Sequence, residues 1–305
     1  MALWSRLSRR YGWLDHIVRA GVRYHRADGR RLAAAVAFYG FFAAFGLGLL
    51  GFAVLGFVLD EPAIARSVQR FLDEHLPPMD TQALRDARSL IGLFALVSLP
   101  VTGMLWVDSL RSSVRALWQV EEYPGRFITR WTFDFLAMVA LGLVLLVSLT
   151  VAFGAEALLE RLLLAAGGDG LAATQWLLAL VGFIFGFVVN TLFAVAVLTL
   201  LPRLRVPWRR VLLPAVVIAV GVEVLTSLGR LVVARAEANP ALQVVAGAAG
   251  LLVFLLILNQ LILFAASLTA TGAGGRVIDL ATGQQLEAVS PIRRTGRGRA
   301  APTSV

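Results

Sequence analysis

The stretch VVAGAAGLLVFLLILNQLILFAASLTA, residues 244–270, contains no charged side chain over 27 consecutive positions. A helix needs about 20 apolar residues to cross a hydrocarbon core of about 30 Å. Because lipid offers the backbone no hydrogen-bonding partner, a chain inside it has to satisfy its own amide groups, and a helix does so. The stretch therefore predicts a transmembrane helix.

Five further apolar runs of similar length precede this stretch. Hydrophobic residues make up 58% of the chain and charged residues only 15%, which is not the composition of a water-soluble domain. We therefore expect an all-α membrane protein with six transmembrane helices in residues 32–270. The five earlier runs are 32–59, 89–107, 133–155, 175–201 and 211–233.

Arginine is distributed unevenly around these runs. Of the 28 basic residues, 21 lie before residue 32, in 108–132, in 202–210 or after residue 270, and seven lie on the alternate side. Lys and Arg are retained on the cytoplasmic side during insertion, so both termini are expected in the cytoplasm. All 28 are arginine, which is typical of a GC-rich bacterial genome. We therefore expect a multi-pass protein of a bacterial inner membrane.

Residues 1–31, ahead of the first run, show a second periodicity. Trp4, Leu7 and Leu14 belong to a set of apolar residues that recur every three or four positions, with arginines mostly on the other faces. This spacing predicts an amphipathic helix over 2–24, which we expect to lie on the inner leaflet. Packing beneath the transmembrane bundle is the alternative, and it requires the same fold.

Two longer polar segments differ in character. Residues 60–88 contain an apolar stripe that ends at Pro77 and Pro78, and they predict a helical extracytoplasmic loop. Residues 271–305 are rich in Gly, Thr, Ser, Pro and Arg and hold too little apolar surface to support a core. We expect them to form a disordered, basic cytoplasmic tail.

The net charge of +9 raises the question of a nucleic-acid partner. The excess arginines lie in short flanks beside membrane helices, where anionic lipid headgroups are the nearest partners. We therefore expect membrane lipids, and no nucleic acid, to bind these flanks.

Signatures of soluble enzymes are absent from the sequence. No P-loop, HExxH or GxSxG motif occurs, the chain has no cysteine, and its three histidines fall on both sides of the predicted membrane. The sequence therefore predicts no enzyme activity, no metal site and no cofactor.

Polar residues near the centres of four predicted helices are the candidate functional residues. Glu223 stands next to the centre of the run 211–233, where an ionised side chain costs at least about 2.5 kcal/mol. Arg230 follows two turns later on roughly the same face. The candidates at similar depth in the other three runs are Asn190, Asn259, Gln260, Ser98 and Thr102.

These groups predict a polar cavity near the bilayer midplane, which is where solute carriers usually bind. Interhelical hydrogen bonding that stabilises the bundle is the alternative, and we favour it for Asn190, Ser98 and Thr102. For Glu223 we favour a functional role, because an amide would serve as well where only a structural hydrogen bond is needed.

Two more acidic residues, Asp108 and Asp134, lie at the cytoplasmic ends of the second and third runs. Water is near such a boundary, so a charge costs less there than at the midplane. We expect these two residues to be boundary residues that pair with Arg111 or Arg130.

Three blocks of sequence lie in the predicted cytoplasmic flanks or directly beside them. They are RLAAAVAFY at 31–39, ALWQVEE at 116–122 and LPRLRVPWRRVLLP at 201–214. In order and spacing they resemble the YihY/BrkB family. The resemblance implies six membrane helices with inner termini and transport-like or envelope-related roles. Many members carry a ribonuclease BN label that is regarded as mistaken, and this sequence does not support that label.

The sixth run departs from the family's pattern. The usual Tyr-Gly opening reads Val245-Ala246, and the usual Gly-Ala-Glu ending reads Ala265-Ala266-Ser267, so a role that depends on that glutamate does not carry over. Our first hypothesis is a permease for a small solute or a lipid. Its rival is a non-transporting membrane protein that organises lipid or envelope components.

The arginine asymmetry predicts the topology, and single cysteines can test it because the chain has none of its own. A cysteine at Ser112 or Thr282 should resist an impermeant thiol reagent added outside intact cells, since both positions belong to Arg-rich segments. A cysteine at Thr81 should react. Labelling of the first two positions from outside would reverse the assignment.

Overall fold

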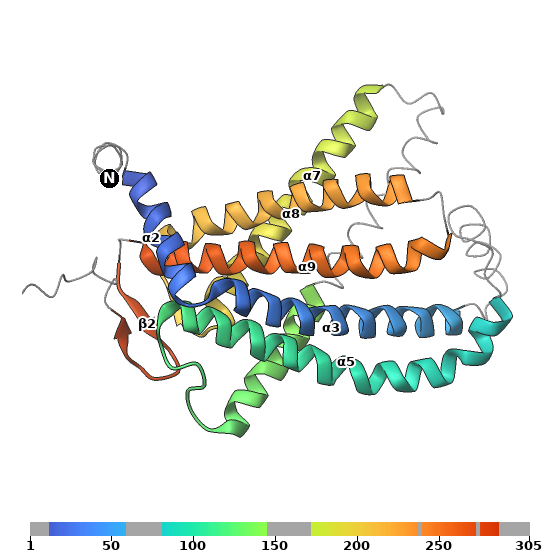
Figure 1. Cartoon of the computed structure of the whole chain (residues 1–305), viewed down its shortest axis with the longest axis horizontal. Helices are drawn as coiled ribbons and strands as arrows, with labels where there is room; N and C mark the ends of the chain where they lie inside the picture. Colours follow the sequence, from blue (N-terminus) through green and yellow to red (C-terminus); the bar gives the residue numbers. More distant parts are fainter. Residues whose placement is uncertain (1–11, 59–80, 145–171, 237–239, 273–274, 287–305) are drawn as a thin grey trace, which may run out of the picture.

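The structure, a computed structural model, describes residues 12–58, 81–144, 172–236, 240–272 and 275–286. Within them the chain is almost entirely helical, and six helices are long and apolar enough to cross a membrane (Figure 1). This confirms the predicted all-α fold with six transmembrane helices. Of the expected extracytoplasmic loop, the part up to residue 80 lies outside the described residues, and 81–88 begin the second transmembrane helix.

The six helices overlap the predicted apolar runs, with bounds that differ at their ends, and residues 59 and 145–155 of these runs lie outside the described residues. The second extends eleven residues beyond its run into an Arg-rich segment, which the sequence had suggested to be a loop. The helices are α3 Gly29–Val58, α5 Thr81–Trp118, Phe127–Val144, α7 Ala172–Val195, α8 Trp208–Ala236 and α9 Pro240–Thr271.

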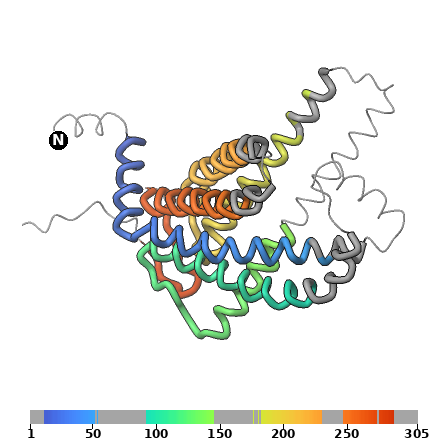
Figure 2. The backbone as a smooth tube through the Cα atoms, turned by 45° about the vertical axis from the view of Figure 1, so that its right-hand side comes forward, coloured from blue at the N-terminus to red at the C-terminus, as the bar shows by residue number. Residues whose placement is uncertain are grey.

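The helices pack most closely in one half of the bundle. α3 runs alongside α5 and α9, and α8 runs beside α9, whereas α7 crosses α8 and diverges from it towards its own N-terminal end (Figures 1 and 2). Val36, Leu110, Leu198 and Leu263 are among the fully buried residues of this half. Since lipid is as apolar as these side chains, close packing and internal hydrogen bonds hold the helices together.

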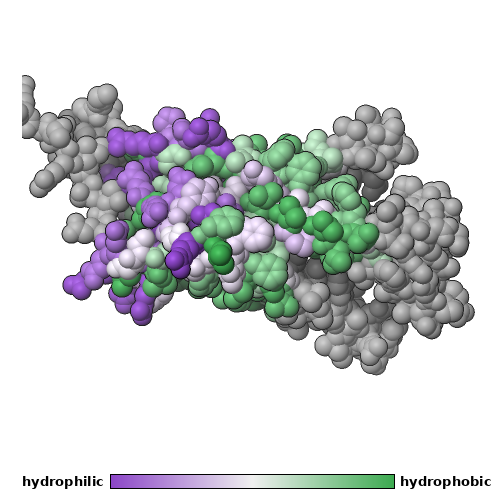
Figure 3. Space-filling view, turned by 90° about the horizontal axis from the view of Figure 1, so that it is seen from below, coloured by the Kyte–Doolittle hydropathy of each residue, from purple (hydrophilic) through white to green (hydrophobic). Residues whose placement is uncertain are grey.

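The Arg-rich segments of the described chain gather at that closely packed end. α2 Gly12–Arg26, the end of α5 and the 201–210 segment lie there (Figure 1). On the face seen in Figure 3, hydrophilic side chains gather at this end, and apolar side chains become more frequent away from it. We refer to it below as the Arg-rich end. Ser112 is buried there, so a cysteine at that position would resist labelling from either side. Thr282 is exposed and is the informative position.

Exposed tryptophans mark both ends of the apolar surface. Trp131 and Trp208 lie at the Arg-rich end, and Trp176 lies near the start of α7, towards the opposite end. Tryptophan is enriched where hydrocarbon meets headgroups. Their placement agrees with helices that cross the membrane along the long axis of the bundle.

The α2 helix crosses the Arg-rich end of the bundle at a steep angle to the transmembrane helices (Figure 2). His16 Nε2 donates to the carbonyl of Leu268, at 2.9 Å, and Arg23 Nε donates to the carbonyl of Leu117, at 2.6 Å. The amphipathic helix predicted over 2–24 is confirmed for residues 12–24 and extends to Arg26, whereas residues 2–11, with Trp4 and Leu7, lie outside the described residues. One of its faces packs beneath the bundle. Trp13 remains 61% exposed, so contact of another face with the leaflet stays a prediction.

A three-stranded sheet closes the Arg-rich end. β1 Leu204–Arg205 pairs with β2 Val277–Asp279, which pairs with β3 Gln285–Leu286, and all three strands are antiparallel to their neighbours. The expectation of a disordered tail from residue 271 is therefore wrong for 275–286. The tail finds order in a partner strand far away in the sequence, which its own composition does not reveal. Residues 287–305 lie outside the described part of the chain.

A buried ion pair attaches this hairpin to α5. Arg115 Nη2 lies 2.7 Å from Asp279 Oδ2, and the two side chains are 1% and 2% exposed. Arg115 also donates to the carbonyls of Glu121 and Pro202, at 2.6 and 2.7 Å. Burial alone would raise the pKa of Asp279, but hydrogen bonds from Arg115, the Ala281 amide and Thr282 outweigh it and hold the pKa below its usual value.

Replacing Asp279 with Asn should destabilise the protein, because it leaves the Arg115 guanidinium buried without its counterion. Removing one partner of a buried pair costs about 3–5 kcal/mol. Asp28→Asn is the control, since the pair of Asp28 with Arg31 is exposed and contributes at most about 1 kcal/mol. Thermal unfolding of both variants in mild detergent measures the difference, and equal unfolding temperatures would contradict this role of the pair.

The same pair predicts a dependence on pH. Because the pKa of Asp279 is lower in the folded protein, ionised Asp279 stabilises the fold above the pKa of the unfolded chain. This contribution is lost as the pH falls through the folded pKa, below about pH 4. The stability difference between wild type and Asp279→Asn should therefore shrink in that range. A difference that stays constant down to pH 3 would contradict the assignment.

Candidate functional site

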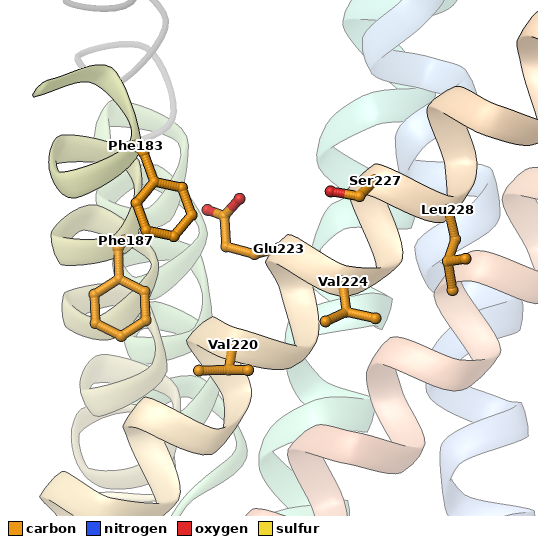
Figure 4. A pocket seen from close by; sticks show the side chains of 7 residues that line it. All are labelled: Phe183, Phe187, Val220, Glu223, Val224, Ser227 and Leu228. Atoms are coloured by element: carbon orange, nitrogen blue, oxygen red, sulfur yellow. The ribbon is translucent and has the colours of Figure 1, made fainter. Parts of the chain in front are cut away.

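Glu223 of α8 points across to α7 (Figure 4), where Asn190 binds it. Asn190 Nδ2 donates to Glu223 Oε1, at 3.1 Å. Gly186 lies one turn earlier on α7, where an added Cβ would lie 3.7 Å from Glu223 Oε1. The carboxyl group therefore lies close to the backbone of α7, at a point where that helix carries no side chain.

A groove of about 600 Å³ runs beside this contact. Two helices line it, α7 with two phenylalanines and α8 with the other residues, and all lining side chains except Glu223 and Ser227 are apolar (Figure 4). Several of them are also more than half exposed, so the groove lies on the outer surface of the described bundle. The lining residues are Phe183, Phe187, Val220, Glu223, Val224, Ser227 and Leu228.

In a bilayer this surface faces lipid or a molecule dissolved in it. An ionised carboxylate near the midplane costs at least about 2.5 kcal/mol, and a hydrogen bond to a charged group returns about 1.5–3 kcal/mol. The bond from Asn190 therefore offsets the cost of the Glu223 charge in part or just balances it. A ligand that donates to the remaining oxygen of Glu223, or a bound proton, would compensate it further.

The other predicted cavity residues do not line this groove. Asn259 is buried and donates to the Leu255 carbonyl of its own helix, and Thr102 donates to the Ser98 carbonyl, both at 2.8 Å. Gln260 is half-buried on α9. Around Glu223, residues of two helices line the groove, and the predicted four-helix cavity stays a prediction. The roles of these residues remain predictions.

Two further points concern the predicted site. The backbone of Arg230 belongs to α8, but its side chain is outside the described part, so its reach towards Glu223 remains a prediction. Among the described residues, no three His, Asp or Glu side chains come close enough together to hold a metal ion.

A second charged cluster lies at the Arg-rich end. Arg111 Nε and Nη2 bind the two oxygens of Asp134, at 2.7 and 3.2 Å, and Nη2 also binds Asp108. Arg130 Nε lies 3.8 Å from Asp108. The expected pairing of both aspartates with these arginines is confirmed. The burial of Arg111 and Arg115 was missed, although Leu110, Val114 and Leu117 continue the apolar helical period through this segment.

Comparisons with known proteins agree with this architecture. Residues 20–286 match the family described as Virulence factor BrkB. An uncharacterized protein of Dickeya dadantii (strain 3937) is 26% identical over 286 residues, which cover 85% of this chain and 86% of the relative. The inner membrane protein YhjD of Escherichia coli (strain K12) is 23% identical over 275 residues, which cover 85% and 81%.

No solved structure matches the chain. The inner-membrane relative and the six apolar helices together support a multi-pass protein of the inner membrane. The family match extends over most of the chain and agrees with the resemblance seen in the three sequence blocks. The chain therefore belongs to the BrkB family of membrane proteins.

Proposed function

We propose that this protein binds and moves an amphiphilic, lipid-like molecule whose polar head is held in the groove between α7 and α8. The observation that supports the proposal is the Asn190–Glu223 contact, at 3.1 Å, beside a lipid-facing groove that is otherwise almost entirely apolar. A single carboxyl in such surroundings suits a ligand with one polar end.

The lining argues for an amphiphile over a strongly hydrated solute. A sugar or an inorganic ion would bring many polar groups against Phe183, Val220 and Leu228, and burying a polar group without a hydrogen bond costs several kcal/mol. An apolar tail lies favourably against these side chains. The volume of about 600 Å³ is that of a typical small-molecule pocket.

The head of the ligand has to donate hydrogen bonds. Glu223 Oε1 already accepts a bond from Asn190, and a carboxylate has further lone pairs that only accept. An amine or a hydroxyl on the ligand satisfies them, and a charged amine also compensates the negative charge. When the ligand leaves, a proton can take its place on the carboxyl, which would couple release to proton uptake.

Glu223→Gln tests the proposal, because it keeps the shape of the side chain and removes the charge. The full chain is reconstituted in vesicles with acyl-labelled phosphatidylethanolamine, and transfer of the label between leaflets is timed by quenching from outside. Loss of a charged hydrogen bond predicts a decrease of at least about tenfold in the transfer rate. Glu122→Gln, at an exposed position of the Arg-rich end, should transfer like wild type.

A second variant tests the space in the groove without changing the charge of Glu223. Val220→Trp fills the groove and leaves Glu223 in place, so it should slow transfer as well. If wild type accelerates transfer and both groove variants do so equally well, the groove is not the route. If wild type binds the labelled lipid without moving it, the rival function, organisation of lipid without transport, is supported instead.

A further inference from the structure

A second cavity, of about 740 Å³, lies at the Arg-rich end and is separate from the Glu223 groove. Its walls come from the helix 127–144, the π-helix η1 Ala196–Leu200 that continues α7, β1 and the turn after β2. One part of the lining carries Asp134 and Arg203. The part further along the helix is apolar, with Ala140 and Val144.

The cavity is therefore amphiphilic along its length. Asp134 and Val144 are ten residues apart on one helix, which corresponds to about 15 Å. Leu200, from η1, is 74% exposed and extends the apolar wall. Such a cavity offers a charged end near the Arg-rich surface and an apolar wall that extends towards the membrane interior.

Arg203 is the cation of this cavity that lacks a counterion. Both oxygens of Asp134 bind Arg111, and both oxygens of Asp279 bind Arg115. Among the described residues, Arg203 forms no ion pair, and its buried Nη2 has no hydrogen-bond partner. With Asp108 and its second partner Arg130 included, three aspartates face four arginines, and one positive charge remains for a ligand.

Burial disfavours the charged form of the Arg203 guanidinium, as expected for a cation without a counterion. Desolvation lowers the pKa of Arg203, and the nearby carboxylates of Asp134 and Asp279 counter it only in part. Arginine stays charged in proteins even so. A bound anion would replace the hydration that the guanidinium has lost.

The backbone fixes Arg203 in an uncommon conformation. Its φ is +56°, in the left-handed region that a residue with a Cβ seldom adopts. Leu280 N donates to the Arg203 carbonyl, at 2.9 Å, and the guanidinium lies 3.6 Å from the centre of the Phe133 ring. A π-helical segment, a feature found frequently at functional sites, directly precedes it. These contacts hold the side chain at the cavity wall.

Two other buried arginines at this end lie beside the ends of helices. Arg23 donates to the carbonyl of Leu117, near the end of α5, and the aliphatic part of Arg210 lies beside Gly272, directly after α9. One buried nitrogen of Arg23 and two of Arg210 have no hydrogen-bond partner among the described residues. The C-terminal carbonyls of a helix carry partial negative charge and stabilise cations. Arg203, unlike Arg23 and Arg210, lines the cavity.

We propose that this cavity binds a singly charged phosphodiester carried on an apolar chain, as in an anionic phospholipid of the adjacent leaflet, with Arg203 as the phosphate ligand. The planar guanidinium fork matches phosphate oxygens, and one phosphodiester charge matches the one uncompensated arginine. The acyl chain lies along the apolar wall of the helix 127–144 and η1. Inorganic phosphate shares the head chemistry but lacks the chain.

The test is lipid binding to the purified full chain in a neutral detergent, followed by native mass spectrometry during titration with phosphatidylglycerol. Wild type should hold one lipid tightly, and Arg203→Gln should weaken this binding by about tenfold or more. Arg205→Gln is the matched control, because Arg205 is exposed two residues away and carries the same charge. It should bind like wild type.

Further arms identify the source of the phosphate and guard against misfolding. Ala140→Trp fills the apolar wall and keeps every charge, so it should also weaken phosphatidylglycerol binding, with wild-type thermal stability as the check on folding. Phosphatidylcholine should bind at least about tenfold more weakly than phosphatidylglycerol. Equal binding of the two lipids, or unchanged binding in both variants, would overturn the proposal. Displacement of the lipid by equimolar inorganic phosphate would also overturn it, because the chain would then contribute nothing.

Discussion

Two buried arginines at the Arg-rich end, Arg111 and Arg115, have their counterions inside the protein, and the packing of that end depends on these pairs. Arg115 is the clearest case, since its guanidinium joins the end of α5 to β2 and to the segment before β1. Arg111 joins α5 to the helix 127–144 in the same way. In the absence of a strong hydrophobic force between helices in lipid, such bonds decide which helix ends meet, and they explain why the buried core is concentrated there.

Features that depend on a continuous stretch of the chain can be predicted from the sequence alone. A transmembrane helix is a continuous apolar run, so all six spans were predictable, and the depth of Glu223 followed from its position in the run. Contacts between distant segments were not predictable in this way. Arg115 and Asp279 are 164 residues apart, and Asn190 and Glu223 are 33 apart, and no periodicity connects them.

The order of the hairpin at 277–286 also depends on contacts with distant parts of the chain. It belongs to the segment 271–305, which is rich in Gly, Thr, Ser, Pro and Arg, and this composition predicts disorder for an isolated segment. β1, a strand of two residues between two prolines, supplies its partner, and Arg115 supplies the counterion of Asp279. Both contributions come from segments that the sequence places in the cytoplasmic flanks between the predicted helices. The error about the tail and the missed burial of Arg115 therefore have a common origin.

The two candidate sites share one continuous element. α7 carries Asn190 on one side of the Glu223 groove, and η1 continues the same helix to Leu200 in the wall of the Arg203 cavity. A π-helical turn has poorer packing than an α-helix and is seldom kept without a local reason. Because a lipid along the η1 wall would contact this turn, its binding would favour the observed geometry of η1. Asn190 lies ten residues before Leu200, about 15 Å away along this continuous helix. Under the two proposals, a lipid bound at the Arg-rich end would therefore contact the same helix that supplies the partner of Glu223.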